Sequence, residues 1–157
     1  IIKTDTTGVI LWDRRYGGND LDIFYSVIST TDGGYLAAGR TGSSNPEGWL
    51  VKTDASGAVV WEYSYGSSYF DMFTSAIQTH DGGYIATGTM TIAASPQEYI
   101  WLVKIDSTGT VEWQKRYAAT TDMRGQSIRQ MPDEGYLVGT DRGMVIRIDG
   151  QGNTGAG

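Results

Sequence analysis

The chain of 157 residues has the length of one ordinary domain, and it contains no cysteine, which excludes a disulfide framework and a thiolate zinc site. Its 12 basic and 18 acidic residues give a net charge of −6, whereas a nucleic-acid or anionic-membrane partner needs a basic face. No run approaches the roughly 18 apolar residues of a membrane span. The 22 glycines, 10 tyrosines and 5 tryptophans favour short strands joined by turns.

One pattern recurs along the chain at intervals of about 50 residues, which is typical of repeat architectures. It runs from Lys3 to Trp12, from Lys52 to Trp61 and from Lys104 to Trp113, and a fourth copy begins at Arg147. Such repeats stack one supersecondary unit on the next, because a single unit cannot bury its own apolar faces.

Each repeat contains four short runs rich in β-branched and aromatic residues, separated by turn residues. The first full repeat predicts strands at 25–30, 35–39, 49–53 and 58–65. The second predicts strands at 74–79, 84–88, 101–105 and 110–117, and a partial copy predicts them at 126–130, 136–139 and 144–148. Asp-Gly at 32–33 and 81–82 is a strong hairpin signal, because such turns need positive φ. No segment keeps a 3.6-residue apolar period, so we predict no helix.

The fold class that follows is an all-β chain of four-stranded antiparallel sheets packed radially, as the blades of a β-propeller. The chain holds about three blades' worth of strands, while closed propellers have about four to eight blades. We therefore expect part of a larger ring, or half of a ring closed by a second copy. The propeller region is assigned to residues 1–149, with repeat units at 1–51, 52–103 and 104–149, and residues 150–157 to a flexible Gly-rich tail or linker.

The Asp, Gly and Trp of each repeat resemble the tryptophan-docking pattern of quinoprotein-type β-propeller repeats. The matching residues are Asp5, Gly8 and Trp12; Asp54, Gly57 and Trp61; and Asp106, Gly109 and Trp113. A lysine stands where that family has a small residue. The whole unit, with its Asp-Gly-Gly-Tyr and Trp-Leu-Val-Lys, looks more like the propeller repeats of secreted or cell-surface proteins of bacteria and archaea. The resemblance implies tryptophans that dock on the adjacent blade rather than form a sugar-binding platform, and an extracellular location.

A catalytic or metal site should break the repeat, since it needs unlike residues at one place. The only histidine, His80, lies beside Asp81 in a predicted turn, and we interpret it as an exposed turn residue. The recurring acids Asp22, Asp71 and Asp122 are expected to cap neighbouring backbone amides, with a ring around a cation as the alternative. No other cofactor and no catalytic residue is predicted.

Loop length breaks the repeat most clearly, between the second and third strand of each repeat. Variable loops on a repeating scaffold commonly carry recognition, although neutral drift in exposed loops is the alternative. We expect these loops to share a face with the links between blades. Candidate binding residues on that face are Asn45, Glu47, Tyr69, Phe70, Gln97, Glu98 and Tyr99.

The leading hypothesis is a noncatalytic, extracellular propeller domain that serves as a scaffold or as a binding surface for a protein or glycan. One alternative is a fragment of a propeller-fold enzyme, such as a quinoprotein-like dehydrogenase or a glycan-active protein. Another is a structural subunit that polymerises through open blade edges. Unmatched edges also predict association with a second copy, by strand exchange, or with further blades of the same parent chain.

Overall fold

The structure is a computed structural model, and it describes residues 1–67, 69–92, 95–117 and 122–155. Within these residues the chain forms thirteen strands and no helix, so the all-β prediction is confirmed. Accordingly, no helix in the described part of the chain has the length and apolar character to cross a membrane.

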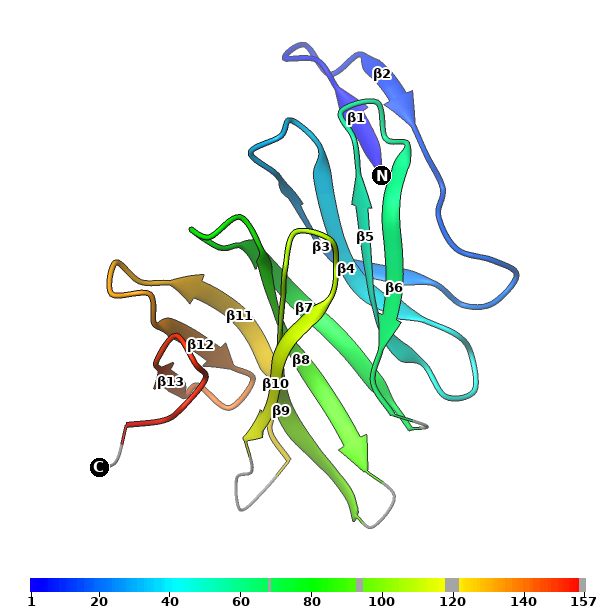
Figure 1. Ribbon diagram of the computed structural model, residues 1–157. Coiled ribbons are helices and arrows are strands. Elements are labelled where there is room, and N and C mark those ends of the chain that lie inside the picture. The colour runs from blue at the N-terminus through cyan, green and yellow to red at the C-terminus, as the bar shows by residue number, and fades with distance from the viewer. Residues whose placement is uncertain (68, 93–94, 118–121, 156–157) are drawn as a thin grey trace.

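The strands form four antiparallel sheets that follow one another in chain order (Figure 1). The first sheet consists of β1 (Ile2–Thr4) and β2 (Ile10–Asp13). The second consists of β3 (Ile23–Ser29), β4 (Tyr35–Thr41), β5 (Glu47–Thr53) and β6 (Val59–Tyr65). The third consists of β7 (Asp71–Gln78), β8 (Tyr84–Ile92), β9 (Ser95–Ile105) and β10 (Val111–Tyr117). The fourth consists of β11 (Gly125–Gln130), β12 (Tyr136–Thr140) and β13 (Val145–Ile148).

The sheets pack face to face in an open series. Strand β7 contacts β3, β4 and β5 of the sheet before it, and β11 contacts β7 and β8 in the same way. The described residues do not close into a ring (Figure 1). The structure therefore establishes a series of stacked antiparallel sheets, and the propeller ring itself is not seen.

The hydrophobic core lies between the sheets rather than inside any one of them. Successive side chains of a strand point to opposite faces. Along β9, Trp101 and Val103 accordingly pack toward the second sheet, while Ile100 and Leu102 pack toward the fourth. This two-sided burial explains why residues 99–105 of β9 form an apolar run interrupted only by Lys104, instead of an alternating pattern.

A β-bulge recurs where the first two strands of each full sheet pair, and it requires a glycine opposite. In the third sheet the register shifts between Phe73 and Ser75, across from Gly88. A Cβ on Gly88 would lie 1.9 Å from the Met72 carbonyl oxygen, so no other residue fits there without moving the backbone.

Two predicted strand ends are wrong for this reason. The strands predicted to stop at Gly39 and Gly88 continue to Thr41 and Ile92, because each glycine accommodates a bulge instead of ending the strand. The residues that follow Gly88 include threonines and an isoleucine, which favour extended backbone. As a result the β8 and β9 hairpin is longer than the predicted strands at 84–88 and 101–105.

A tryptophan on the last strand of each of the first three sheets, and a tyrosine four residues later, attach that sheet to the next one. On β6, the Trp61 Nε1 donates to the Ser107 carbonyl at 3.1 Å, and the Tyr65 hydroxyl donates to the Gly109 carbonyl at 2.8 Å. Burial of Tyr65 raises the pKa of its hydroxyl, which therefore stays a donor at neutral pH. We name this arrangement the Trp–Tyr docking contact.

The docking contact recurs at the other two sheet boundaries. Tyr16 donates to the Gly57 carbonyl at 2.8 Å, and Tyr117 donates to the Gly152 carbonyl at 2.5 Å. In each case the tryptophan ring also meets the edge of a tyrosine that begins the second strand of the next sheet. These ring pairs are Trp12 with Tyr35, Trp61 with Tyr84, and Trp113 with Tyr136.

The turn whose glycine carbonyl accepts the tyrosine hydrogen bond is held in shape by an aspartate side chain. We name it the receiving turn. Asp106 accepts from the amides of Thr108 and Thr110 at 2.8 and 3.0 Å, and from the Thr108 hydroxyl at 2.7 Å. The Thr108 hydroxyl bond and these amides lower the pKa of Asp106. Equivalent bonds form at Asp5, Asp54 and Asp149.

A fourth copy of this turn follows β13, in the region assigned from the sequence to a Gly-rich tail or linker. Asp149 accepts from the amides of Gln151 and Asn153, and Thr154 pairs with Ile148. Residues 150–155 thus complete a receiving turn of the same kind, and residues 156–157 lie outside the described part of the chain.

Candidate functional site: an acidic groove between two sheets

A groove of about 430 Å³ lies between the third and fourth sheets, on the side of the receiving turns. We name it the acidic groove. The residues that line it come from β9, β10 and β12, from the end of β11 and from three turns. They are Asp81, Lys104, Glu112, Trp113, Gln130, Glu134, Tyr136, Gly150 and Gln151.

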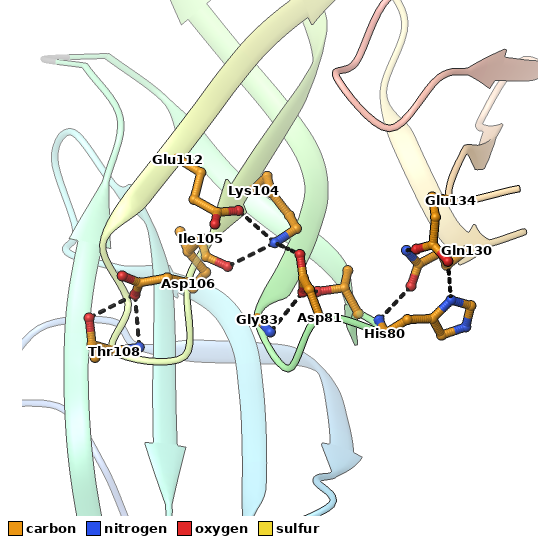
Figure 2. Close-up of polar contacts among 11 residues, drawn as sticks. His80, Asp81, Gly83, Lys104, Ile105, Asp106, Thr108, Glu112, Gln130 and Glu134 are labelled. Carbon is orange, nitrogen blue, oxygen red and sulfur yellow. Dashed lines mark hydrogen bonds and ion pairs between the residues drawn. The ribbon is translucent and has the colours of Figure 1, made fainter.

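A buried lysine forms the centre of the groove. The side chain of Lys104 is 4% exposed, and its Nζ lies 2.9 Å from Asp81 Oδ2 and 2.6 Å from Glu112 Oε2. Figure 2 shows both carboxylates converging on this amine, which also donates to the Ile105 carbonyl at 3.4 Å. Both carboxylates thus pair with the buried ammonium, and a buried charge needs such pairing.

The second sheet contains the same lysine with one carboxylate fewer. Lys52 Nζ lies 2.7 Å from Asp32 Oδ2 and donates to the Thr53 carbonyl at 2.8 Å. Glu112 is a bulge residue. It lies between Val111, which pairs with Ile105, and Trp113, which pairs with Lys104. In the first two sheets this position holds Leu11 and Val60. The second carboxylate is thus a departure from the repeat.

A polar contact across the sheet boundary lies beside the lysine (Figure 2). His80 Nδ1 is 3.1 Å from Glu134 Oε1, and Gln130 Nε2 donates to Glu134 Oε2 at 2.9 Å. The Gln130 side chain also accepts from the His80 amide at 2.9 Å. His80 was predicted as an exposed turn residue; its side chain is indeed 58% exposed, but it also connects two sheets.

Part of this contact belongs to the repeat, and part does not. The amide of Thr31 donates to Gln78 at 2.8 Å, just as the amide of His80 donates to Gln130. At the boundary between the second and third sheets, Thr31 occupies the position of His80, and Gly82 occupies the position of Glu134. The histidine ring and the glutamate therefore have no counterpart at that boundary.

Glu134 is also the one non-glycine residue with positive φ in the part of the chain that the structure describes, at 62°. The equivalent turn residues are Gly33 at 83° and Gly82 at 85°. A left-handed conformation costs an L-residue about 1 to 2 kcal/mol, so Glu134 is held in a strained backbone that glycine would relieve.

The groove carries net negative charge. Its lining holds three carboxylates, on Asp81, Glu112 and Glu134, against the single ammonium of Lys104. Burial raises the pKa of the Asp81 carboxyl, but hydrogen bonds from Thr79, Lys104 and the Gly83 amide outweigh that effect and hold the pKa at about 2. The carboxylates of Asp81, Glu112 and Glu134 remain 56%, 45% and 61% exposed. They are therefore accessible to a positively charged group from outside.

The recurring aspartates hold the links between sheets. Asp22 accepts from the Gly18 amide at 2.8 Å and the Thr41 hydroxyl at 2.6 Å. Asp71 accepts from the Thr91 amide at 3.1 Å, and Asp122 from the Glu98 amide at 3.0 Å. Among the described residues, no group of three or more His, Cys, Asp or Glu side chains could hold a metal ion.

The predicted binding face is only partly made of loops. Asn45 lies in the loop between β4 and β5, and Tyr69 and Phe70 lie in the link before β7, 42% and 37% exposed. Glu47, Gln97, Glu98 and Tyr99 lie in strands, because β5 and β9 begin earlier than predicted. The Asp71 amide, at the end of this link, donates to the carbonyl of Pro46 in the loop between β4 and β5 at 2.8 Å.

We name the predicted binding face, which includes Asn45, Tyr69 and Phe70, the link face. One ion pair and one cation–ring contact stabilise much of it. Glu98 accepts from the Arg124 guanidinium at 2.6 and 2.8 Å, which joins β9 to the link before β11. The Arg40 guanidinium lies 5.3 Å from the centre of the Phe70 ring. These contacts stabilise the scaffold, and they bring together no set of unlike residues comparable to the acidic groove.

Sequence reasoning found His80 and Asp81 but not Lys104, Glu112, Gln130 or Glu134. A position-by-position comparison of the repeats carries the missing signal, because Glu112 and Glu134 occupy positions where the other copies have apolar residues or glycine. That the two departures lie in the same groove follows only from the stacking of the third and fourth sheets.

Comparison with known proteins adds information on the fold alone. No protein-family model and no curated protein matches the chain. A crystal structure of a protein of unknown function from Bacteroides caccae is similar, with a TM-score of 0.65 and 14% sequence identity. The similarity covers 94% of this chain and 49% of that one, so the chain spans about half the length of the solved protein.

Proposed function

We propose that the chain is a noncatalytic β-propeller segment that acts as a scaffold and binds a positively charged segment of a protein partner in the acidic groove. The observation that carries this proposal is the position of the departures from the repeat. His80, Glu112 and Glu134 each depart from the residue that the other repeats have at the same position; Glu112 and Glu134 line this groove, and His80 contacts Glu134.

The chemistry of the groove favours an ammonium or guanidinium group. Its carboxylates already hold one ammonium, that of Lys104, and they stay exposed on their outer side. Trp113, Gln130 and Gln151 add an apolar surface and amide groups beside the carboxylates, which suits a peptide better than a bare ion.

The propeller assignment rests on the recurring Trp–Tyr docking contact. Each sheet attaches to the next through the same residues at the same positions. Repetition of one contact geometry rotates each sheet equally relative to the one before, and such a series forms a ring where the rotation returns the last sheet to the first.

Binding of two matched peptides tests the function. A Lys-Ser repeat peptide and a Glu-Ser repeat peptide of equal length are titrated against the chain, with intrinsic tryptophan fluorescence and calorimetry as readouts. We expect the lysine peptide alone to bind, with an affinity that falls as salt is added. The double variant E112V/E134G, which restores residues of the repeat, should weaken binding about tenfold.

The matched control removes two carboxylates elsewhere, in the variant D13N/E62Q. Asp13 and Glu62 are exposed residues of the first two sheets, outside the acidic groove. Equal binding of both peptides, or an equal loss in the control variant, would show that only the overall negative charge attracts the peptide.

A further inference from the structure

A second groove lies beside the tryptophan of β5, on the side of the second sheet that faces the first. Its volume is about 630 Å³, within the range of about 300 to 1,000 Å³ that holds small molecules. We name it the tryptophan groove. It is lined by two residues of the link before β3 and five of the second sheet, which are Gly17, Gly18, Thr41, Trp49, Glu62, Tyr63 and Ser64.

The same position is hollow again between the second and third sheets, both of which have four strands. The hollow there has a volume of about 320 Å³. Its lining residues occupy the positions of Thr41, Trp49, Glu62, Tyr63 and Ser64, and they are Met90, Trp101, Gln114, Lys115 and Arg116. A groove beside this tryptophan is therefore a feature of the repeating sheet, while its chemistry differs from one sheet to the next.

The two tryptophans are held alike but differ in their hydrogen bonds. Trp49 stacks on Phe24, and Trp101 stacks on Phe73, each with ring centroids 4.6 Å apart. The Trp101 Nε1 donates to Gln114 Oε1 at 3.2 Å.

Glu62 occupies the position of Gln114, and within the described residues the Trp49 Nε1 makes no hydrogen bond. Equivalent stacking directs this N–H toward Glu62, as it directs that of Trp101 toward Gln114. The Trp49 side chain is only 4% exposed. An almost fully buried side chain thus presents an unpartnered donor to the groove.

The groove also holds an unpaired acceptor. Glu62 pairs with Val51, two residues from Trp49, so the carboxylate lies on the same face as the indole. It is exposed, and in the part of the chain that the structure describes it takes part in no ion pair or hydrogen bond. A cation would serve only the carboxylate and an anion only the N–H, whereas neighbouring hydroxyl groups can serve both.

We propose that the tryptophan groove binds a neutral saccharide. One sugar hydroxyl accepts from the Trp49 Nε1, and a hydroxyl donates to the Glu62 carboxylate. Ser64, directly opposite Trp49 in the strand register, adds a protein hydroxyl beside them.

The rim of the groove is fixed before any ligand binds. Asp22 accepts from the Gly18 amide at 2.8 Å and from the Thr41 hydroxyl at 2.6 Å, and both donors line the groove. Such preorganisation reduces the entropy lost on binding. This inference concerns the second sheet and does not depend on the acidic groove.

Titration of the ¹⁵N-labelled chain with neutral disaccharides tests the proposal. Maltose, cellobiose, lactose and chitobiose are added separately, and the indole N–H signals of the five tryptophans are followed. Sodium acetate and tetramethylammonium chloride are the ionic controls. We expect at least one disaccharide to shift the Trp49 indole signal saturably and neither ion to shift it. No saturable shift with any of the four sugars, or an equal shift with either ion, would overturn the proposal.

A matched pair of variants tests the roles of the two groups. Glu62→Gln introduces the residue of the third sheet, whose amide oxygen should accept from the Trp49 N–H and weaken sugar binding about tenfold. Asp13→Asn removes a carboxylate of the first sheet outside the groove and should leave the affinity unchanged. Equal affinities of Glu62→Gln and wild type would contradict the assignment of Glu62 and Trp49 to the site.

A measurement without ligand checks the same pairing. Hydrogen exchange of the Trp49 indole N–H should be faster than that of Trp101 in the wild type, and it should slow in Glu62→Gln. Exchange that is equally slow for both indoles in the wild type would mean that the Trp49 donor is already paired, and would overturn the proposal.

Discussion

The two buried lysines differ in the number of carboxylates that neutralise them. Lys52 has Asp32 at 2.7 Å, whereas Lys104 has both Asp81 at 2.9 Å and Glu112 at 2.6 Å. Removing the partner of a buried charge is costly when nothing else compensates it. The same substitution should therefore have unequal effects in the two sheets.

We predict that Asp32→Asn lowers the free energy of unfolding by about 1 to 2 kcal/mol, a value reduced because the Asp32 side chain is 59% exposed. Asp81→Asn should lower the free energy of unfolding by a clearly smaller amount, because Glu112 still neutralises Lys104. Urea unfolding at pH 7 measures both. Equal losses would show that Glu112 contributes nothing to the neutralisation of Lys104.

The effect of Asp32→Asn should also depend on pH. The Lys52 hydrogen bond, followed by those of Thr30 and Gly34, lowers the pKa of Asp32 below its usual value of 3.8. A carboxyl with a lowered folded-state pKa stabilises the fold above its unfolded-state pKa, and this contribution is lost as the pH falls through the folded-state pKa. The gap between wild type and variant should be full at neutral pH and shrink as the pH falls below about 4. A gap that is constant down to acid pH would contradict this assignment.

Glu134 has a strained backbone conformation, and substitutions test whether its side chain is needed for stability or only for binding. Replacement by glycine relieves the backbone at φ 62°, so Glu134→Gly should leave stability unchanged or raise it by about 1 kcal/mol. The reverse change, Gly82→Glu at φ 85°, should lower stability by a similar amount. Chemical denaturation of both variants measures the difference. A large loss in Glu134→Gly would mean that its contacts to His80 and Gln130 hold the sheets together.

At the scale of elements, the Trp–Tyr docking contact is the unit that joins one sheet to the next. The Tyr65 hydroxyl satisfies the Gly109 carbonyl, and Gly109 is buried. Tyr65→Phe leaves that carbonyl without its partner and should cost about 1 to 2 kcal/mol of unfolding free energy. Tyr63→Phe is the matched control, because Tyr63 is 49% exposed, and it should be nearly neutral. Similar losses of unfolding free energy in the two variants would show that the Tyr65 hydroxyl bond does not stabilise the docking contact.

Strand identity could be predicted from local sequence, whereas strand ends could not. The alternation of β-branched residues and Asp-Gly turns places the expected strands within the observed sheets. Gly39 and Gly88 misled the prediction because a glycine opposite a bulge and a glycine that ends a strand look the same in sequence. Only the close approach of a facing carbonyl distinguishes them.

At the scale of the whole molecule, the repeat predicts a series of stacked sheets, and the similarity to the longer Bacteroides caccae protein agrees with that fold. The acidic groove was beyond sequence reasoning for a different reason. His80 and Glu134 lie 54 positions apart, and Lys104 and Glu112 belong to different strands. Their proximity arises from the stacking of two sheets and from the register of β9 with β10.

The structure leaves two surfaces that differ in chemistry. The acidic groove gathers three carboxylates on the side of the receiving turns. The link face carries the exposed rings of Tyr69 and Phe70. A binding scaffold with its recognition site in the groove should respond to a cationic partner there and remain unchanged on the link face.

Amide chemical-shift mapping with the Lys-Ser repeat peptide tests this claim most directly. We predict that the shifts on the ¹⁵N-labelled chain cluster at His80, Glu112, Gln130 and Glu134, and that they disappear in E112V/E134G. Shifts that instead cluster at Tyr69, Phe70 and Tyr99 would contradict the account and move the binding site to the link face.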